Sequence, residues 1–376
     1  MRMRNRGKNI WQLRWELGRD DHGQRRQKTE TFHGNKKSAE QRWREVQATL
    51  DGHPATAWAR EDLTCGDYLL KWLAYLATTE LRPTTLASYR FYVERYLRPA
   101  LGTAKLTQLT PLHLQEVLQQ WQTQPGHSGH GLARSTVRRM LIIMQRALTQ
   151  AVHWEMIPAN PARGIRLRPA TPPEIHWWTP AAAQQFLAVS DTHRLAVAFR
   201  LALFGGLRMG EVLGLRWQDV DWAQQTLTIR QIVTVLRDSV QVSAPKTAKS
   251  QRTIKVDQQI LGALRARQHT QKLERLAKGW PVTDYVITTR KGTICWPHTI
   301  NDILDRLIQE ADVPRIRFHD LRHTHATWLA QAGVHPKVIA DRLGHTRIGF
   351  TLDTYVHSDL ADQEKALQLL APFGPD

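Results

Sequence analysis

Residues 163–175, RGIRLRPATPPEI, interrupt a well-patterned chain with prolines and arginines. This composition favours an extended linker, because proline lacks a backbone donor and disfavours helix in the residue before it. A chain of 376 residues is also too long for one typical hydrophobic core. A second linker-like stretch, PATAWAREDL, spans residues 54–63. We therefore predict three domains, at residues 1–55, 63–165 and 175–376.

The first predicted domain is a small α+β unit. Residues 10–17, IWQLRWEL, alternate so that Trp11, Leu13 and Trp15 share one face, which is typical of a half-buried strand. The turn GRDDHGQ leads to a second strand, RRQKTETFH, and Asn35 stands at the N-cap position of a following helix. A two-stranded basic ribbon fits the DNA major groove, although a plain packing domain would have the same pattern.

The second predicted domain is helical throughout. Apolar side chains recur at spacings of three and four in GDYLLKWLAYL, and Pro83 and Pro99 bound a second helical pattern. Several basic and aromatic residues lie on helical faces that we expect to be exposed: Tyr89, Arg90, Arg95, Arg134, Arg138 and Arg139. Single helix arginines are usually solvated, but their number here favours contact with phosphates.

The net charge is +18, and the positive excess extends through all three predicted domains. This distribution is expected of a chain that lies along a polyanion, so nucleic acid is favoured over a basic surface kept for solubility. The candidate DNA contacts outside the chemical motifs are Arg14, Arg25, Arg90, Arg134 and Arg138.

The cysteines and the hydropathy pattern exclude several other classes. Cys65 and Cys295 lie far apart without a CxxC motif, so neither a zinc ribbon nor a disulfide framework is expected. The basic N-terminus is not followed by an apolar run, and no stretch approaches the ~20 apolar residues of a membrane span. We expect an intracellular, cytoplasmic protein.

The motif LFGGLRMGE carries the first chemical groups. Gly205 and Gly206 break an apolar helix, Arg208 follows, and Glu211 comes three residues later. Glycines let a backbone approach another group closely, arginine is a forked donor suited to phosphate oxygens, and Glu211 could orient it. A helix corner with a surface ion pair is the plain alternative.

The motif SAPKTAKSQRTI lies between two predicted strands, with Lys246 at the tip of the expected hairpin. A lysine near phosphate can donate a proton to a leaving oxygen. Lys249 competes for this role, and turn lysines are commonly just solvated.

The motif HDLRHTH places His319 and Arg322 three residues apart, and therefore on one face of a helix. His323 and His325 invite a metal interpretation, but their spacing does not fit and no cysteine or carboxylate set completes a site. An arginine among imidazoles favours a bound anion instead.

The motif LGH, ending at His345, precedes Tyr355 by ten residues. A tyrosine with an ordinary pKa near 10 is a poor nucleophile until positive charge stabilises its phenolate. The arginines, lysine and histidines of the preceding motifs would supply that charge, and would also stabilise a pentacoordinate phosphorane. A half-buried helical tyrosine is the alternative.

In this order, GLRMGE, the hairpin lysine, HDLR, LGH and the closing tyrosine resemble the tyrosine recombinases of the phage-integrase family, over essentially the whole chain. The resemblance implies a multidomain fold: a small N-terminal α+β arm-binding domain, an all-α SAM-like core-binding domain and a mainly α (α+β) catalytic domain. It also implies an integrase that cleaves and rejoins DNA strands and integrates or excises a mobile element.

The resemblance further implies catalytic roles by position. Arg208, Arg322 and His345 would bind the scissile phosphate. Lys246 would protonate the leaving 5′ oxygen, and His319 would assist proton transfer.

The nucleophile implied by the resemblance is Tyr355, which would form a 3′-phosphotyrosine link. No cofactor or metal is implied, because that link conserves the energy of the phosphodiester. The implied partners are double-stranded DNA attachment sites of core and arm type, a homotetramer on DNA, and accessory proteins that bend DNA or direct excision. Gly349 and Phe350 depart from the family pattern, which bears on the packing of that helix. The segment ALQLLAPF, residues 366–373, could dock on a neighbouring subunit or on its own domain.

Two other functions remain open. A type IB topoisomerase-like enzyme would use a similar set of residues to nick and reclose one duplex. A non-catalytic DNA-binding regulator would keep the fold without turnover.

Overall fold

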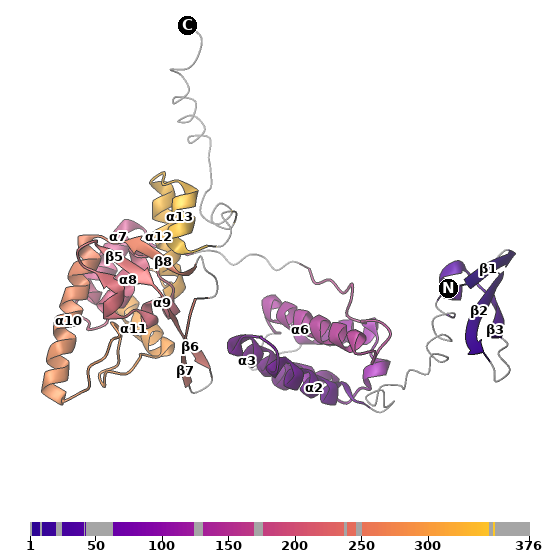
Figure 1. The fold of residues 1–376 in the computed structure, drawn as a ribbon. Coiled ribbons are helices and arrows are strands. Elements are labelled where there is room, and N and C mark those ends of the chain that lie inside the picture. The colour runs from indigo at the N-terminus through magenta and orange to yellow at the C-terminus, as the bar shows by residue number, and fades with distance from the viewer. Residues whose placement is uncertain are drawn as a thin grey trace, which may run out of the picture. The chain divides into compact units, whose positions relative to one another are not determined.

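The computed structural model describes residues 2–7, 10–19, 25–40, 42, 63–123, 131–168, 176–236, 239–245, 250–345 and 349. The chain forms two compact units, Met1–Ala170 and Thr171–Asp376. Figure 1 labels their main helices and strands. Large buried hydrophobic clusters lie in each unit separately. The separation of residues 1–55 from 63–165 stays a prediction. None of the helices in the described part of the chain has the length and apolar character that a membrane crossing needs.

The N-terminal sheet has the antiparallel strand order β1 (Arg2–Gly7), β2 (Ile10–Arg19) and β3 (Arg25–His33). The prediction of a two-stranded ribbon was incomplete, because a third strand is present. The basic segment β1 pairs with the edge of β2 that β3 does not cover. Leu13 in the middle of β2 is fully buried, as its alternating pattern predicted. Asn35 caps the next helix as expected, since its Oδ1 accepts from the backbone N–H of Ser38 at 2.9 Å.

Helices fill the rest of the described first unit. They are α2 (Cys65–Ala77), α3 (Pro83–Tyr92), the π-helix η1 (Val93–Leu97), α4 (Arg98–Leu101), the 3₁₀ turn η2 (Leu106–Gln108), α5 (Pro111–Thr123) and α6 (Arg134–His153). The side chain of Thr64 caps α2 by accepting from the backbone N–H of Asp67 at 3.1 Å. The predicted apolar face of α2 is the buried face, formed by Tyr68, Leu69, Trp72, Leu73 and Leu76.

Tyr89 corrects the expectation of an exposed basic and aromatic face. Its ring is 8% exposed and stacks on Trp72 at a centroid distance of 5.7 Å. Its hydroxyl accepts from Nη1 of Arg146 at 2.9 Å. Tyr89 is buried because it shares a four-residue spacing with Val93 and Leu97, which face the same core.

The arginines near Tyr89 remain accessible to solvent. Arg90 is partly exposed and lies 4.0 Å from the carboxylate of Glu94. The other helix arginines named above as exposed are so in the structure: Arg95, Arg134, Arg138 and Arg139.

The second unit is mainly helical. Its helices are α7 (Pro180–Ser190), α8 (Ala196–Leu203), α9 (Met209–Gly214), the 3₁₀ turn η3 (Trp217–Asp219), α10 (Gln258–Lys278), α11 (Pro297–Glu310), α12 (Phe318–Gln331) and α13 (Pro336–Leu343). Its described strands are β4 (Val220–Asp221), β5 (Thr226–Ile229), β6 (Ile232–Leu236), β7 (Ser239–Ser243) and β8 (Arg252–Lys255).

The strands of the second unit form two small sheets rather than one series of hairpins. One sheet has the order β4-β5-β8 and the other pairs β6 with β7. The run TLTIRQIVTVL has a strand-like composition throughout, but it is divided between β5 and β6, which belong to different sheets. Because β7 and β8 belong to different sheets, the prediction of a hairpin formed by these two runs is wrong. Lys246, expected at the tip of that hairpin, lies outside the described residues.

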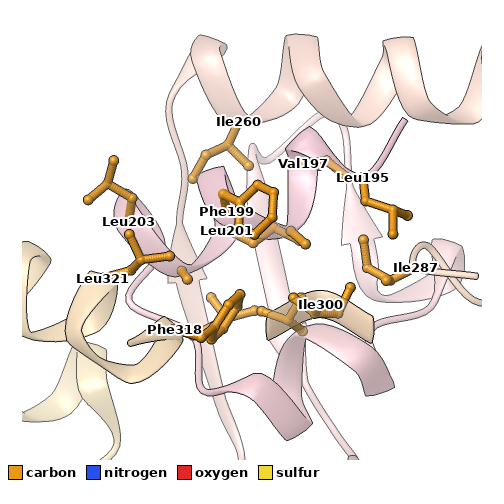
Figure 2. Close-up of a cluster of buried hydrophobic side chains, with 14 of the residues drawn as sticks. Leu195, Val197, Phe199, Leu201, Leu203, Ile260, Ile287, Ile300, Phe318 and Leu321 are labelled. Atoms are coloured by element: carbon orange, nitrogen blue, oxygen red, sulfur yellow. The ribbon is translucent and has the colours of Figure 1, made fainter. Parts of the chain in front are cut away.

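Helix α8 lies at the centre of the hydrophobic core of this unit. Figure 2 shows Phe199 and Leu201 of α8 among Ile260 of α10, Ile300 of α11 and Phe318 of α12, and all five side chains are at most 3% exposed. Leu203, the last residue of α8, is also fully buried in this core, so packing fixes the start of the turn that follows. That turn contains the GGLR motif.

His325 joins α12 to α8 and α13 through both ring nitrogens. Nδ1 lies 3.0 Å from the carbonyl oxygen of Leu203, and Nε2 accepts from Nε of Arg342 at 3.1 Å. The ring must therefore be neutral, with its proton on Nδ1. Burial, followed by the charge of Arg342, lowers the pKa of His325 to about 3.

We expect His325 to make the second unit less stable as the pH falls. The unfolded chain binds a proton on this ring near its ordinary pKa of 6.5, whereas the native ring resists protonation down to about pH 3. The free energy of unfolding should then fall below about pH 6.5, by up to ~1.4 kcal/mol per pH unit from this ring. Urea unfolding of wild type and His325→Gln between about pH 7 and 5 measures the difference, because the variant lacks the titrating ring.

The matched control is His269→Gln, which changes an exposed histidine on α10. It should keep the wild-type dependence of stability on pH. If His325→Gln also kept that dependence, the neutral buried ring would not be the cause of it.

Candidate active site

The turn between α8 and α9 requires glycine at position 206. Gly206 has φ +67°, and a Cβ atom there would lie 2.7 Å from Cδ2 of His325 and 2.9 Å from a methyl carbon of Leu343. The backbone can therefore pass close to α12 and α13 only without a side chain. Arg208 follows as the N-cap residue of α9.

Glu211 in the first turn of α9 is buried and accepts four hydrogen bonds. Two come from Arg208: its backbone N–H donates to Oε2 at 2.9 Å and its Nη1 to Oε1 at 2.8 Å. Two come from Arg252: Nη1 donates to Oε1 and Nη2 to Oε2, each at 2.9 Å. The side chain of Glu211 is 2% exposed and that of Arg252 is 6% exposed, whereas Arg208 is 35% exposed.

These partners keep the carboxyl group of Glu211 ionised. Burial alone would raise the pKa of its carboxyl, but the hydrogen bonds and charge of Arg252, followed by the charges of Arg208 and Arg322, lower that pKa to about 2. Glu211 is therefore ionised at neutral pH. With its single negative charge set against three guanidiniums, the cluster has an excess of two positive charges.

Arg322 is fixed in the interior beside this cluster. Its side chain projects from α12 and donates to the carbonyl oxygens of Gly206 and Leu343. Its Nη1 lies 4.0 Å from Oε2 of Glu211. The two carbonyls belong to the α8–α9 turn and to the end of α13, so Arg322 connects three segments of the site.

Three histidines surround the arginines. His319, in the first turn of α12, reaches solvent and makes an edge-to-face contact with His323 at a centroid distance of 4.9 Å. His345 directly follows Gly344, which ends α13 with φ +66°. Nη2 of Arg208 donates to the carbonyl oxygen of Gly344 at 3.4 Å.

The histidine nearest to solvent and the histidine after α13 are both neutral at pH 7. Partial burial, then the charges of His323, Arg322 and Arg208, lower the pKa of His319 to about 4. Burial, then Arg322, Arg208 and Arg252, lower that of His345 to about 3. A neutral imidazole can donate one hydrogen bond and accept another, so each ring is equipped to hold or move a proton.

A groove borders the site on the side of His319. It has a volume of about 680 Å³, and its lining includes His176, Arg315, Arg317 and Met209. Arg315 and Arg317 are largely exposed, although each is paired with a carboxylate. Their partners, Asp305 and Asp320, line the same groove, so its arginines are balanced by carboxylates.

The structure thus brings together four predicted site residues, namely Arg208, His319, Arg322 and His345. Lys246, its competitor Lys249, Tyr355 and the segment 366–373 lie outside the described residues. Of the candidate DNA contacts, Arg14 lies on β2 and Arg25 begins β3, while the other three lie on α3 and α6. Within the described residues, no group of three or more His, Cys, Asp or Glu side chains could hold a metal ion.

Two arginines of the site were missed by the sequence interpretation. Arg252 begins β8 and holds Glu211, and Arg342 in the last turn of α13 donates to His325 and to the carbonyl oxygens of Lys255 and Phe204. A weak signal was present for Arg252, since an arginine stands at the start of the otherwise strand-like run RTIKV. Its partner could not be inferred, because Glu211 is 41 residues away in the chain.

Comparisons with known proteins agree with this geometry. The Phage integrase family matches residues 176–361, and the family described as Phage integrase, N-terminal SAM-like domain matches residues 64–122. The tyrosine recombinase XerC-like protein of Caldanaerobacter subterraneus subsp. tengcongensis is 26% identical over 385 residues, which cover 97% of this chain and 96% of that protein.

Two solved structures have the same fold. The Tn1549 transposon integrase in complex with a circular intermediate DNA has a TM-score of 0.70 at 18% identity, covering 82% of this chain and 99% of that chain. A lambda integrase tetramer bound to a Holliday junction has a TM-score of 0.57 at 15% identity, covering 95% of this chain and 96% of that one. The fold is therefore a SAM-like helical domain followed by a mostly helical catalytic domain with small sheets. By its sequence matches, this chain belongs to the phage integrase family of tyrosine recombinases.

Proposed function

We propose that this chain is a site-specific DNA recombinase that cuts and rejoins strands through a 3′-phosphotyrosine intermediate, and so integrates or excises a mobile element. The observation that carries the proposal is the cluster of Arg208 and Arg322 around Glu211, with two neutral histidines beside it. Family membership supports the same reaction.

The scissile phosphate would bind at Arg208, Arg322 and His345. Arg208 is partly exposed, and only one of its five side-chain N–H groups is bonded to Glu211. Other N–H groups of its guanidinium would therefore bind the phosphate. The excess of two positive charges suits a phosphodiester, and suits still better the extra negative charge of a pentacoordinate phosphorane. These groups would stabilise the transition state without moving, because Glu211 and backbone carbonyls already hold both arginines.

The covalent step would be an attack by the phenolic oxygen of Tyr355 on phosphorus. The bond to the 5′ oxygen breaks, and that oxygen takes a proton from Lys246, while a phosphotyrosine joins the enzyme to the 3′ end. His319, held neutral beside Arg322, would assist proton transfer by taking the proton that the phenol of Tyr355 loses as it attacks. Reversal of the same steps by a 5′ hydroxyl reseals the strand, so the reaction itself requires neither a metal nor a nucleotide cofactor. Lys249 remains the alternative proton donor.

The partners that we propose are double-stranded attachment sites. A net charge of +18 supports binding to DNA. The helical domain would bind the core site, and the N-terminal sheet would bind arm sites. A homotetramer would carry out the four strand cuts of a complete exchange, as the lambda integrase tetramer on a Holliday junction suggests by analogy. Proteins that bend DNA or direct excision would act on this assembly.

Replacing Tyr355 by Phe should abolish the covalent adduct while DNA affinity stays near that of wild type. The measurement uses a nicked suicide duplex taken from DNA flanking the gene, with the linked residue mapped by mass spectrometry. An adduct that persisted in Tyr355→Phe would move the nucleophile elsewhere. A wild-type chain that binds this duplex without forming any adduct would favour the DNA-binding regulator, and relaxation of supercoils on any sequence would favour the topoisomerase-like enzyme.

Replacing Arg208 by Ala should slow adduct formation by ~10²-fold or more, as expected for the loss of a donor to the transition state. The single-turnover rate on the suicide duplex measures this effect. The matched control is Arg306→Ala, which removes an exposed arginine paired with Glu310 on α11. Equal rates for the two variants would contradict the assignment of Arg208.

Deleting residues 1–55 should weaken binding to outlying arm sites and leave cleavage of a short core duplex intact. The reason is that the N-terminal sheet is proposed to contact only the arm sites. Gel-shift titrations with arm and core duplexes, run beside the adduct assay, measure both effects. A truncated chain that no longer cleaved the core duplex would show that the arm-binding assignment is wrong.

A further inference from the structure

Arg252 is the most fully engaged arginine of the site, and no role for it follows from the motifs. Its guanidinium forms a two-pronged pair with Glu211, with both N–O distances at 2.9 Å. Its Nε donates to the carbonyl oxygen of Arg342 at 2.6 Å, and its Nη1 also lies 3.4 Å from that of Ser250. With a side chain only 6% exposed and its fork occupied by protein acceptors, Arg252 is poorly placed to bind a phosphate itself.

The bonds from Arg252 complete the acceptor capacity of Glu211. A carboxylate has about four lone-pair positions, and here Arg252 fills two while Arg208 fills two, one of them through its backbone N–H. Arg322 remains 4.0 Å away and donates instead to the carbonyls of Gly206 and Leu343. The distribution of donors thus depends on Arg252 occupying half of the carboxylate.

Without Arg252, Glu211 would be a buried carboxylate with two vacant acceptor positions. Leaving such a group unsatisfied is costly, so neighbouring donors would turn toward it. The nearest donors are the forks of Arg208 and Arg322. Arg208 would then be drawn from the orientation in which it can face a phosphate, and Arg322 from the carbonyl oxygens of Gly206 and Leu343. The positive excess of the cluster would also fall from two charges to one.

We propose that Arg252 is a positioning residue for strand cleavage: it saturates Glu211, and thereby leaves the fork of Arg208 for the scissile phosphate and keeps Arg322 on the carbonyl oxygens of Gly206 and Leu343. This proposal rests on the function proposed above. It adds a residue that touches neither DNA nor the nucleophile and acts through the buried carboxylate.

Arg252 also positions the site through its hydrogen bonds to backbone carbonyl oxygens. It begins β8, directly after the connection that contains Lys246, and its Nε holds the last turn of α13, three residues before His345. Its fork holds the first turn of α9. One guanidinium therefore joins the start of β8 to α9, which follows Arg208, and to α13, which precedes His345.

The test is to replace Arg252 by Met in the full-length chain and to measure binding and cleavage separately on the suicide core duplex. Adduct formation in a single turnover should be slower by ~10²-fold, because small misplacements of catalytic groups cost about that much. The dissociation constant of the duplex should stay within about threefold, because most phosphate contacts lie elsewhere. Arg252→Lys, which keeps the charge but loses the fork, should fall between Arg252→Met and wild type.

The matched control is Arg216→Met. Arg216 also pairs with a buried carboxylate, Asp219, which is 1% exposed, but it lies beyond the other end of α9. This control should lose thermal stability and keep its cleavage rate at temperatures where it is folded. If it lost cleavage as strongly as Arg252→Met, or if folded Arg252→Met cleaved like wild type, the positioning role would be refuted.

A crystal structure of Arg252→Met decides the same question without any cleavage assay. Arg208 should turn both prongs of its fork onto Glu211, or Arg322 should approach within hydrogen-bond distance of it. Unchanged positions of both arginines would overturn the proposal. If wild type formed no adduct, the proposed function would fail instead, and this structure would still show whether Arg252 directs the two forks.

Discussion

The second unit is organised around a buried carboxylate shared by cations. Glu211 is inaccessible to solvent and remains ionised because the neighbouring guanidiniums outweigh the cost of burial. Each of its oxygens accepts two bonds, so the directions of the surrounding donors are largely determined by one side chain. An array of like charges would otherwise repel and spread apart. The carboxylate therefore both permits the arginines to lie close together and sets which way they point.

Most of the site residues lie at the ends of helices, and Arg322 is the exception. Arg208 precedes α9, His319 begins α12 and His345 follows α13. At such ends the backbone also has carbonyls and N–H groups without helical partners, and Arg322 uses two of these carbonyls. The buried helix α8 makes this arrangement stable, because its core packing fixes the glycine turn against which α12 and α13 lie.

Much of the site was predictable from local patterns, and the remainder depends on contacts between distant residues. GLRMGE and HDLR predicted Arg208 with Glu211, and His319 with Arg322, because each pair is three residues apart on one helix. The strand pairing was harder: nothing local shows that the run containing Arg230 bends from one sheet into another. The segment before β2 looked merely basic, yet it pairs because an open strand edge lies beside it. Arg252 was missed because its partner, Glu211, lies in α9, 41 residues away in the chain.

The π-helix η1 has a consequence for how the helical domain can vary in length. Tyr89, Val93, Leu97 and Leu101 are all buried and are spaced four residues apart, which in a regular α-helix would drift steadily around the axis. The wide turn takes up one surplus residue and cancels the drift. A chain shortened by one residue between Val93 and Leu97 would have the spacings four, three and four, which an ordinary α-helix places on one face. At this point, the loss of one residue therefore leaves the buried positions of the core occupied.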